Sequence, residues 1–212
     1  MGSRDDWFRS PAWSAADQEE FFARLRRSRK SGAQYLRIKA LSLQHATLFE
    51  EALELLNRFF QEYPGHFDTA QAFLQQAHCC TALGRLEEAE TSFRSALRHE
   101  QGHGSVRTLA WIDFPWFIVR HGRQDLYPEA LAVLDAGEKE AVLPLPTLRY
   151  QSAATRAIIF AGRGDTVQAR RFARMAMEAA AATDSGLAYH GSVGLVENPD
   201  PVIHEQVRAL AG

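Results

Sequence analysis

Small residues recur along this chain at matched positions of two successive apolar segments. Ala89 follows Ala77 by twelve residues, and bulky Phe93 and small Ala96 come four and seven residues after Ala89. Residues three or four apart share one face of a helix, so these positions form an apolar stripe. Matched small residues let two helix backbones approach closely. The spacing therefore predicts an antiparallel helix hairpin whose turn begins at Gly84.

The same hairpin signature occurs four times. The other copies pair Ala40 with Ala52, Ala157 with Ala169 and, with three residues inserted in the turn, Pro115 with Ala130. Successive first-helix positions lie 37, 38 and 42 residues apart. A unit that recurs in this way predicts a stacked helical repeat, in which each unit buries its apolar face on its neighbours.

Cap and stop signals extend the helical prediction to nearly the whole chain. Ser14-Ala15-Ala16-Asp17 resembles a capping box, and Thr47-x-x-Glu50 and Asp165 are expected to cap later helices. No segment shows convincing strand alternation between turn signals. The predicted helices cover about residues 14–30, 33–45, 47–63, 68–84, 86–100, 106–121, 128–140, 147–161, 165–182 and a last short segment ending at Leu210.

The hairpin segments resemble the tetratricopeptide repeat family. Trp111-x-x-Phe114-Pro115-x-x-Ile118 matches the pattern of its first helix, with Pro where the family has a small residue. Phe73…Ala77-x-x-Cys80 and Leu36…Ala40-x-x-Leu43 match it less fully, and the units are longer than the family's roughly 34 residues. The resemblance implies an all-α, right-handed α-solenoid of about four repeats over residues 33–183. Residues 1–32 then supply an aromatic segment and an extra N-terminal helix, and residues 184–212 a Gly-rich loop and a short capping helix.

The same resemblance implies a non-catalytic scaffold that binds a peptide or a partner protein in a concave groove and needs no cofactor. The family's groove positions correspond here to Gln34, Arg37, Gln44, Gln71, Leu74, His78, Ile112, Trp116 and Arg120. Amides are suited to a partner's main chain, and arginines to an acidic side chain or a C-terminal carboxylate. The neighbouring Phe117 and Trp116 fit either a core under a loop or a binding surface.

Two motifs suggest other functions. His99-Glu100-Gln101-Gly102-His103 fits the H-E-x-x-H string of zinc hydrolases, which requires one continuous helical turn. Because the repeat register ends a helix there, we interpret the string as a helix terminus with no bound metal. The basic cluster at 24–30 (Arg24, Arg26, Arg27, Arg29 and Lys30) is compatible with nucleic acid, but cations are also favourable at a helix C-terminus.

Composition limits the remaining possibilities. The net charge of −2 gives no electrostatic reason to expect nucleic acid or an anionic membrane as a partner. Cys79 and Cys80 are adjacent and poorly placed to bridge each other, which favours a reducing, cytoplasmic location. No apolar stretch is long enough to span a membrane.

Three large aromatic residues precede the first predicted helix. Trp7, Phe8 and Trp13 would form a costly exposed patch unless they are buried. We expect them to dock on the first hairpin of their own chain and leave a monomer, because a short tether favours the local site. Insertion into a second copy, which would make a homodimer, is the alternative.

Overall fold

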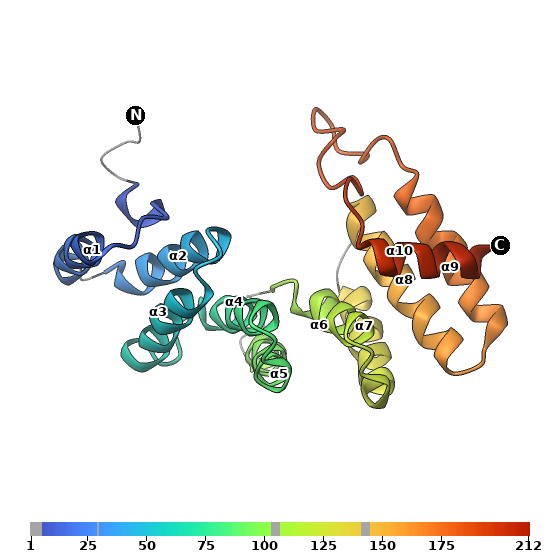
Figure 1. Cartoon of the computed structure of the whole chain (residues 1–212), viewed down its shortest axis with the longest axis horizontal. Helices are drawn as coiled ribbons and strands as arrows, with labels where there is room; N and C mark the ends of the chain where they lie inside the picture. Colours follow the sequence, from blue (N-terminus) through green and yellow to red (C-terminus); the bar gives the residue numbers. More distant parts are fainter. Residues whose placement is uncertain (1–5, 29, 103–106, 141–144) are drawn as a thin grey trace. The chain divides into compact units, whose positions relative to one another are not determined.

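The computed structural model describes residues 6–28, 30–102, 107–140 and 145–212 (Figure 1). These residues form helices and connecting turns with no strand among them, which confirms the predicted all-α class. The helices are η1 (Trp7–Arg9), α1 (Ala15–Arg27), α2 (Gly32–His45), α3 (Phe49–Glu62), α4 (Thr69–Ala82), α5 (Leu86–Gly102), α6 (Ala110–Arg120), η2 (Gln124–Leu126), α7 (Tyr127–Glu140), α8 (Pro146–Gly162), α9 (Thr166–Ala180) and α10 (Pro201–Ala211), where η marks a 3-10 helix.

The chain divides into two compact units, Met1–Ala110 and Trp111–Gly212. The first unit holds α1 to α5, and the second holds α7 to α10 with nearly all of α6. The division falls inside the predicted repeat region 33–183, between its second and third hairpins. The single right-handed solenoid therefore stays a prediction.

Sequence neighbours pack as helix pairs inside each unit. In the first unit α2 packs on α3 and α4 on α5, and in the second α8 packs on α9, with α10 lying across both (Figure 1). The alanines predicted at the close contacts are all at most 1% exposed: Ala40, Ala52, Ala77, Ala89, Ala157 and Ala169. The predicted register of these three hairpins is confirmed.

The third hairpin keeps its contact despite the predicted insertion. The three-residue helix η2 lies in its turn, and both small positions, Pro115 and Ala130, are buried. At the next small position, Gly137, an added Cβ would come within 2.6 Å of Cδ2 of Trp111. The Trp111 ring therefore packs directly on the α7 backbone, which leaves no room for a side chain.

One turn geometry joins the helices of all four hairpins. Two residues after each first helix ends, one residue has positive φ, and the next residue's N–H donates to the carbonyl five residues before it. The left-handed residues are Thr47, Gly84, Gly122 and Gly164, with φ of 61°, 73°, 64° and 79°, and the bonds run from Leu48 to Leu43, Arg85 to Cys80, Arg123 to Ile118 and Asp165 to Phe160, at 2.9–3.0 Å. This is a Schellman-type stop, in which glycine carries no steric penalty.

Several predicted helix ends need correction. Thr47 is not a helix cap: α3 begins after Leu48 without a side-chain cap, and Thr47 takes the left-handed position that glycine fills elsewhere. Helix α1 ends at Arg27 rather than Lys30, and α5 continues beyond Glu100 to Gly102. The caps at Ser14, in a capping box with Asp17, and at Asp165 are confirmed.

The aromatic N-terminal segment docks on α1 and on α2, the first helix of the first hairpin, whereas the predicted monomer stays a prediction. Phe8 stacks on Tyr35 of α2 at 4.5 Å between ring centroids, and Trp7 lies 5.2 Å from Phe21 of α1. Trp13 also packs edge-on against Phe21, at 5.6 Å. The segment thus shields the apolar faces of α1 and α2.

A buried lysine fixes this segment. Lys39 of α2 is 2% exposed, and its Nζ donates to the carbonyl oxygens of Ser10 at 2.6 Å and Ala12 at 2.9 Å. The same Nζ lies 4.8 Å from the centroid of the Trp13 ring, in cation–π range. Burial lowers the pKa of Lys39, and the negative charge of Asp17 opposes that shift.

Overpacking the second hairpin should destabilise the protein. Ala89 is fully buried at the α4–α5 contact, so Ala89→Leu should lower the free energy of unfolding by about 1–3 kcal/mol in a denaturant titration. Ala82→Leu is the matched control on the same hairpin, because Ala82 is exposed. Equal stability of the two variants would argue against the close contact.

Relieving the one non-glycine hairpin turn should stabilise the protein. Thr47→Gly removes a β-branched residue from left-handed backbone and should raise the free energy of unfolding by about 0.5–1 kcal/mol. The gain is limited because glycine has more conformational freedom in the unfolded chain. The reciprocal Gly84→Thr should lower it by about 1–3 kcal/mol. A loss of stability in Thr47→Gly would contradict the strain assigned to this turn.

Removing the Lys39 ammonium should loosen the N-terminal segment. Lys39→Met keeps the length of the stem but loses two charge-assisted hydrogen bonds, so cleavage after exposed Arg9 by an arginine-specific protease should accelerate by about tenfold. Lys30→Met, at an exposed lysine, should leave the cleavage rate unchanged. Unchanged cleavage in both variants would mean that the aromatic contacts alone hold the segment.

Candidate functional site

In the first unit the predicted groove residues are largely engaged by their own chain. Nε of Arg37 lies 3.2 Å from a carboxylate oxygen of Asp68, with both side chains mostly buried. Leu74 is buried, whereas Gln34 is exposed. The other predicted positions here, Gln44, Gln71 and His78, are half-buried. Of this set, only Gln34 offers a freely exposed side chain.

In the second unit two of the three predicted groove residues line one pocket. Ile112 is 1% exposed and belongs to the core, whereas Trp116 is half-buried and Arg120 is exposed. We call the pocket of about 620 Å³ beside them the α6–α8 pocket. It is lined by Trp116 and Arg120 of α6, by Thr147, Tyr150 and Gln151 of α8, and by residues 195–201.

Helical spacing explains how the two helices present these side chains. Trp116 and Arg120 are four residues apart on α6, and Tyr150 and Gln151 follow Thr147 by three and four residues on α8. Residues at these spacings lie on one helix face. The centroids of the Trp116 and Tyr150 rings are 6.1 Å apart, so the aromatic side of the pocket comes from both helices.

The Tyr150 hydroxyl is held at the base of α10. Its oxygen lies 3.2 Å from Nδ1 of His204. Burial, with a smaller contribution from the negative charge of Asp200, raises the pKa of Tyr150 to about 12. The phenol therefore stays protonated at neutral pH and is no candidate for a general base.

The C-terminal segment closes one side of the pocket through Arg120. Nε of Arg120 lies 3.0 Å from one carboxylate oxygen of Asp200, and the other oxygen accepts from the backbone N–H groups of Val202 and Ile203 at the start of α10. Thr147 also donates its N–H to the Gly194 carbonyl at 2.8 Å. One aspartate thus caps a helix and ties the segment to α6.

Sequence reasoning missed Tyr150 and the segment 195–201. The available signal was Asn198-Pro199-Asp200-Pro201, in which an Asp–Pro pair is typical of a helix start. That signal predicts α10 but not the contact of Asp200 with Arg120, eighty positions earlier in the chain.

The described part of the H-E-x-x-H string has a packing role. Glu100 is 5% exposed, and its carboxylate accepts from the backbone N–H of Thr108 at 3.0 Å and from the Thr108 hydroxyl. Burial raises the pKa of Glu100, and the Thr108 hydrogen bonds oppose the shift. His103 lies outside the described residues. Within residues 6–28, 30–102, 107–140 and 145–212, no three His, Cys, Asp or Glu side chains gather as metal ligands.

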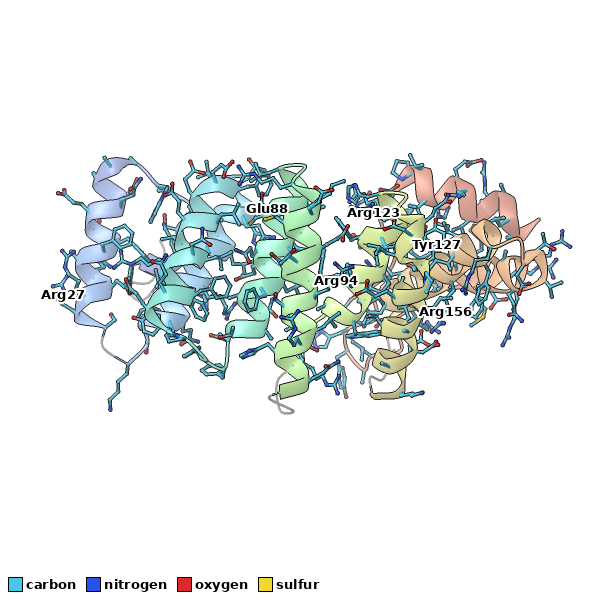
Figure 2. All side chains as sticks on the ribbon, turned by 90° about the horizontal axis from the view of Figure 1, so that it is seen from below. Arg27, Glu88, Arg94, Arg123, Tyr127 and Arg156 are labelled. Carbon is cyan, nitrogen blue, oxygen red and sulfur yellow. The ribbon has the colours of Figure 1, made fainter. Side chains whose placement is uncertain are left out.

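The basic cluster at 24–30 is only partly free. Arg24 pairs with Glu20 and lies 5.8 Å from the Trp7 ring centroid. Arg27 is exposed on the outer side of α1 (Figure 2), and Arg26 and Lys30 are exposed as well. Arg29 lies outside the described residues. The described residues of the cluster therefore form no organised binding site that would support the nucleic-acid alternative.

The two cysteines are buried in α4 and carry free thiols. Burial raises the pKa of Cys79 to about 12 and that of Cys80 to about 11, with smaller charge effects from their neighbours. A thiol that stays protonated at neutral pH is a poor nucleophile. Both side chains therefore act as small apolar residues of the core.

Comparisons of the chain with protein-family models, with curated proteins and with solved structures found no match. The relationship to tetratricopeptide repeats accordingly remains a resemblance. In the part of the chain that the structure describes, no helix combines the length and the apolar character needed to cross a membrane.

Proposed function

We propose that this protein is a non-catalytic binding scaffold, similar in use to tetratricopeptide repeat proteins, that receives an extended segment of a partner protein at the α6–α8 pocket. The supporting observation is the pair Arg120–Asp200. It joins a pocket arginine to a carboxylate at the end of the chain's own non-helical segment before α10.

Arg120 has capacity left for a partner. Its side chain is 55% exposed, whereas that of Asp200 is 16% exposed. A guanidinium presents five N–H donors in a planar fork, and only its Nε faces the Asp200 oxygen at 3.0 Å. The remaining donors suit a second carboxylate, from an acidic side chain or a chain terminus.

The wall of the pocket suits an extended main chain. Residues 195–199 are neither helical nor strand, and in the described part of the chain their backbone N–H and C=O groups make no intramolecular hydrogen bond. An extended peptide running beside them would satisfy such groups in the manner of strand addition. Trp116 and Tyr150 supply aromatic faces for an apolar side chain of that peptide.

A photo-crosslinker in the pocket would identify the partner. p-Benzoylphenylalanine in place of Gln151, which lines the pocket, should capture a protein from a cell extract, and the same group at exposed Gln206 of α10 serves as the control. A captured protein common to both positions would be a non-specific contact. The proposal would be overturned if no protein were captured at Gln151, or if every protein captured there were also captured at Gln206.

Binding of the captured partner should depend on the two α6 residues. Trp116→Ala and Arg120→Ala should each weaken binding by at least about tenfold in calorimetry, as expected of anchor residues. Arg163→Ala is the control, because exposed Arg163 lies outside the pocket. Circular dichroism should show folded variants, and full affinity in both α6 variants would contradict this site.

A further inference from the structure

The opposite face of α8 carries a second hollow, of different chemistry. It measures about 390 Å³ and is lined by Glu138, Arg149, Ser152, Ala153, Arg156, Phe172, Met175, Glu178 and Ala179. At about 100° of rotation per residue, Arg149, Ser152, Ala153 and Arg156 point roughly away from the α8 residues that line the α6–α8 pocket. The two hollows are therefore separate sites of one unit.

The floor of this hollow is built around a buried arginine that two carboxylates neutralise. Arg156 (labelled in Figure 2) is 8% exposed, and its two terminal nitrogens lie 2.8 Å from carboxylate oxygens of Asp135 and Glu138. Ser152 donates to Glu138, and the Arg156 guanidinium lies 5.6 Å from the Phe172 ring centroid. Because Arg156 is buried and already has two carboxylate partners, it is not available to a partner's carboxylate.

Apolar side chains line another part of the hollow. Ala153 and Ala179 are buried beside the hollow, and Met175 is 45% exposed at its edge. Methionine is flexible and polarisable, and it is favoured on surfaces that adapt to a partner's side chain. The hollow thus suits one large apolar side chain.

Arginines without a carboxylate partner lie at the hollow and along the adjoining surface of α9. Arg149 lines the hollow, and Arg170, Arg171 and Arg174 line a depression beside it. Arg149, Arg170, Arg171 and Arg174 are all exposed, and none forms an ion pair within the described part of the chain. Arg174 donates to the Ala211 carbonyl, and Arg171 lies over the Phe172 ring. We call these four arginines with the hollow the α8–α9 arginine surface. Two acidic side chains belong to it: exposed Glu178, and Glu138, which pairs with Arg156.

The surface extends along α9 beyond the hollow. A further depression, lined by Thr166, Val167, Arg170, Arg171, Arg174, Met175 and Glu178, shares Met175 and Glu178 with the hollow. From Val167 to Glu178 the helix rises about 16 Å. An extended chain of about five residues covers that length, whereas a small anion does not.

We propose that the α8–α9 arginine surface binds an acidic, extended segment of a partner protein that places one large apolar side chain in the hollow. The arginine forks complement carboxylates. Exposed ion pairs contribute little individually, so the apolar side chain is needed for affinity. The hollow suits an apolar side chain beside Ala153, Met175 and Ala179, which a peptide supplies and a phosphate backbone does not, and this favours a peptide over a nucleic acid.

Selection from random peptides displayed on phage tests this proposal without knowledge of the partner. The full-length protein is the bait, and clones are counter-selected on Arg149→Glu/Arg170→Glu/Arg171→Glu. The surviving clones should carry several Asp or Glu residues around one large apolar residue. No enriched clone, or clones without acidic residues, would overturn the proposal.

Synthetic peptides from the selected clones then locate the site by fluorescence anisotropy. Their affinity should fall at least about tenfold in the triple variant and in Met175→Glu, which places a carboxylate at the edge of the hollow. The charge-matched control Arg26→Glu/Arg27→Glu/Arg98→Glu reverses three exposed arginines of the other unit and should bind normally. Trp116→Ala should also bind normally, and a loss there instead would assign the peptides to the α6–α8 pocket.

A nucleic acid is the remaining occupant to exclude. Short single-stranded DNA should not displace the peptides at equal concentration. Displacement by DNA, or equal affinity of the triple variant and the wild type, would show general polyanion attraction and overturn the proposal.

Discussion

The close contact between the two helices of a hairpin is the constraint on which this structure depends. Alanine at both sides of the contact brings the backbones together, and a short connection is then required between the helices. In three hairpins the second alanine comes five residues after the left-handed turn residue, as in Gly84 and Ala89. The position of the turn residue and the position of the helix contact are thus coupled along the sequence, so a shift of one requires a shift of the other.

The third hairpin shows how much variation this geometry tolerates. Its turn still stops α6 at Gly122, and the extra residues form η2 before α7 begins. Pro115 replaces alanine inside α6 without ending the helix. Proline is compact enough for the contact, although it removes one helical hydrogen bond. Spacing relative to the contact, rather than unit length, therefore preserves the hairpin.

Local spacing accounts for what the sequence could predict. It identified the buried alanines and the insertion before Ala130, because helical periodicity fixes which side chains share a face. Trp116 and Arg120 of the pocket came instead from the family resemblance. Local spacing could not identify Thr47 as a left-handed residue. The other three hairpins have glycine at this position, and Thr47-x-x-Glu50 instead matched the pattern of a helix cap. Nor could it foresee the Lys39 and Asp200 contacts, which join segments distant along the chain.

These two contacts also indicate which unit is open to a partner. In both units a cation on the first helix of a hairpin holds a segment of its own chain. Lys39 holds the residues before α1, and Arg120 holds the segment before α10. A tethered segment competes at an effective concentration of about millimolar, so a free partner gains little by displacing it. Lys39 is 2% exposed and is fully used by its segment, whereas the Arg120 side chain remains 55% exposed. Under the proposed function, this exposure lets a partner bind beside Asp200 without displacing it, and the proposal therefore assigns recognition to the second unit.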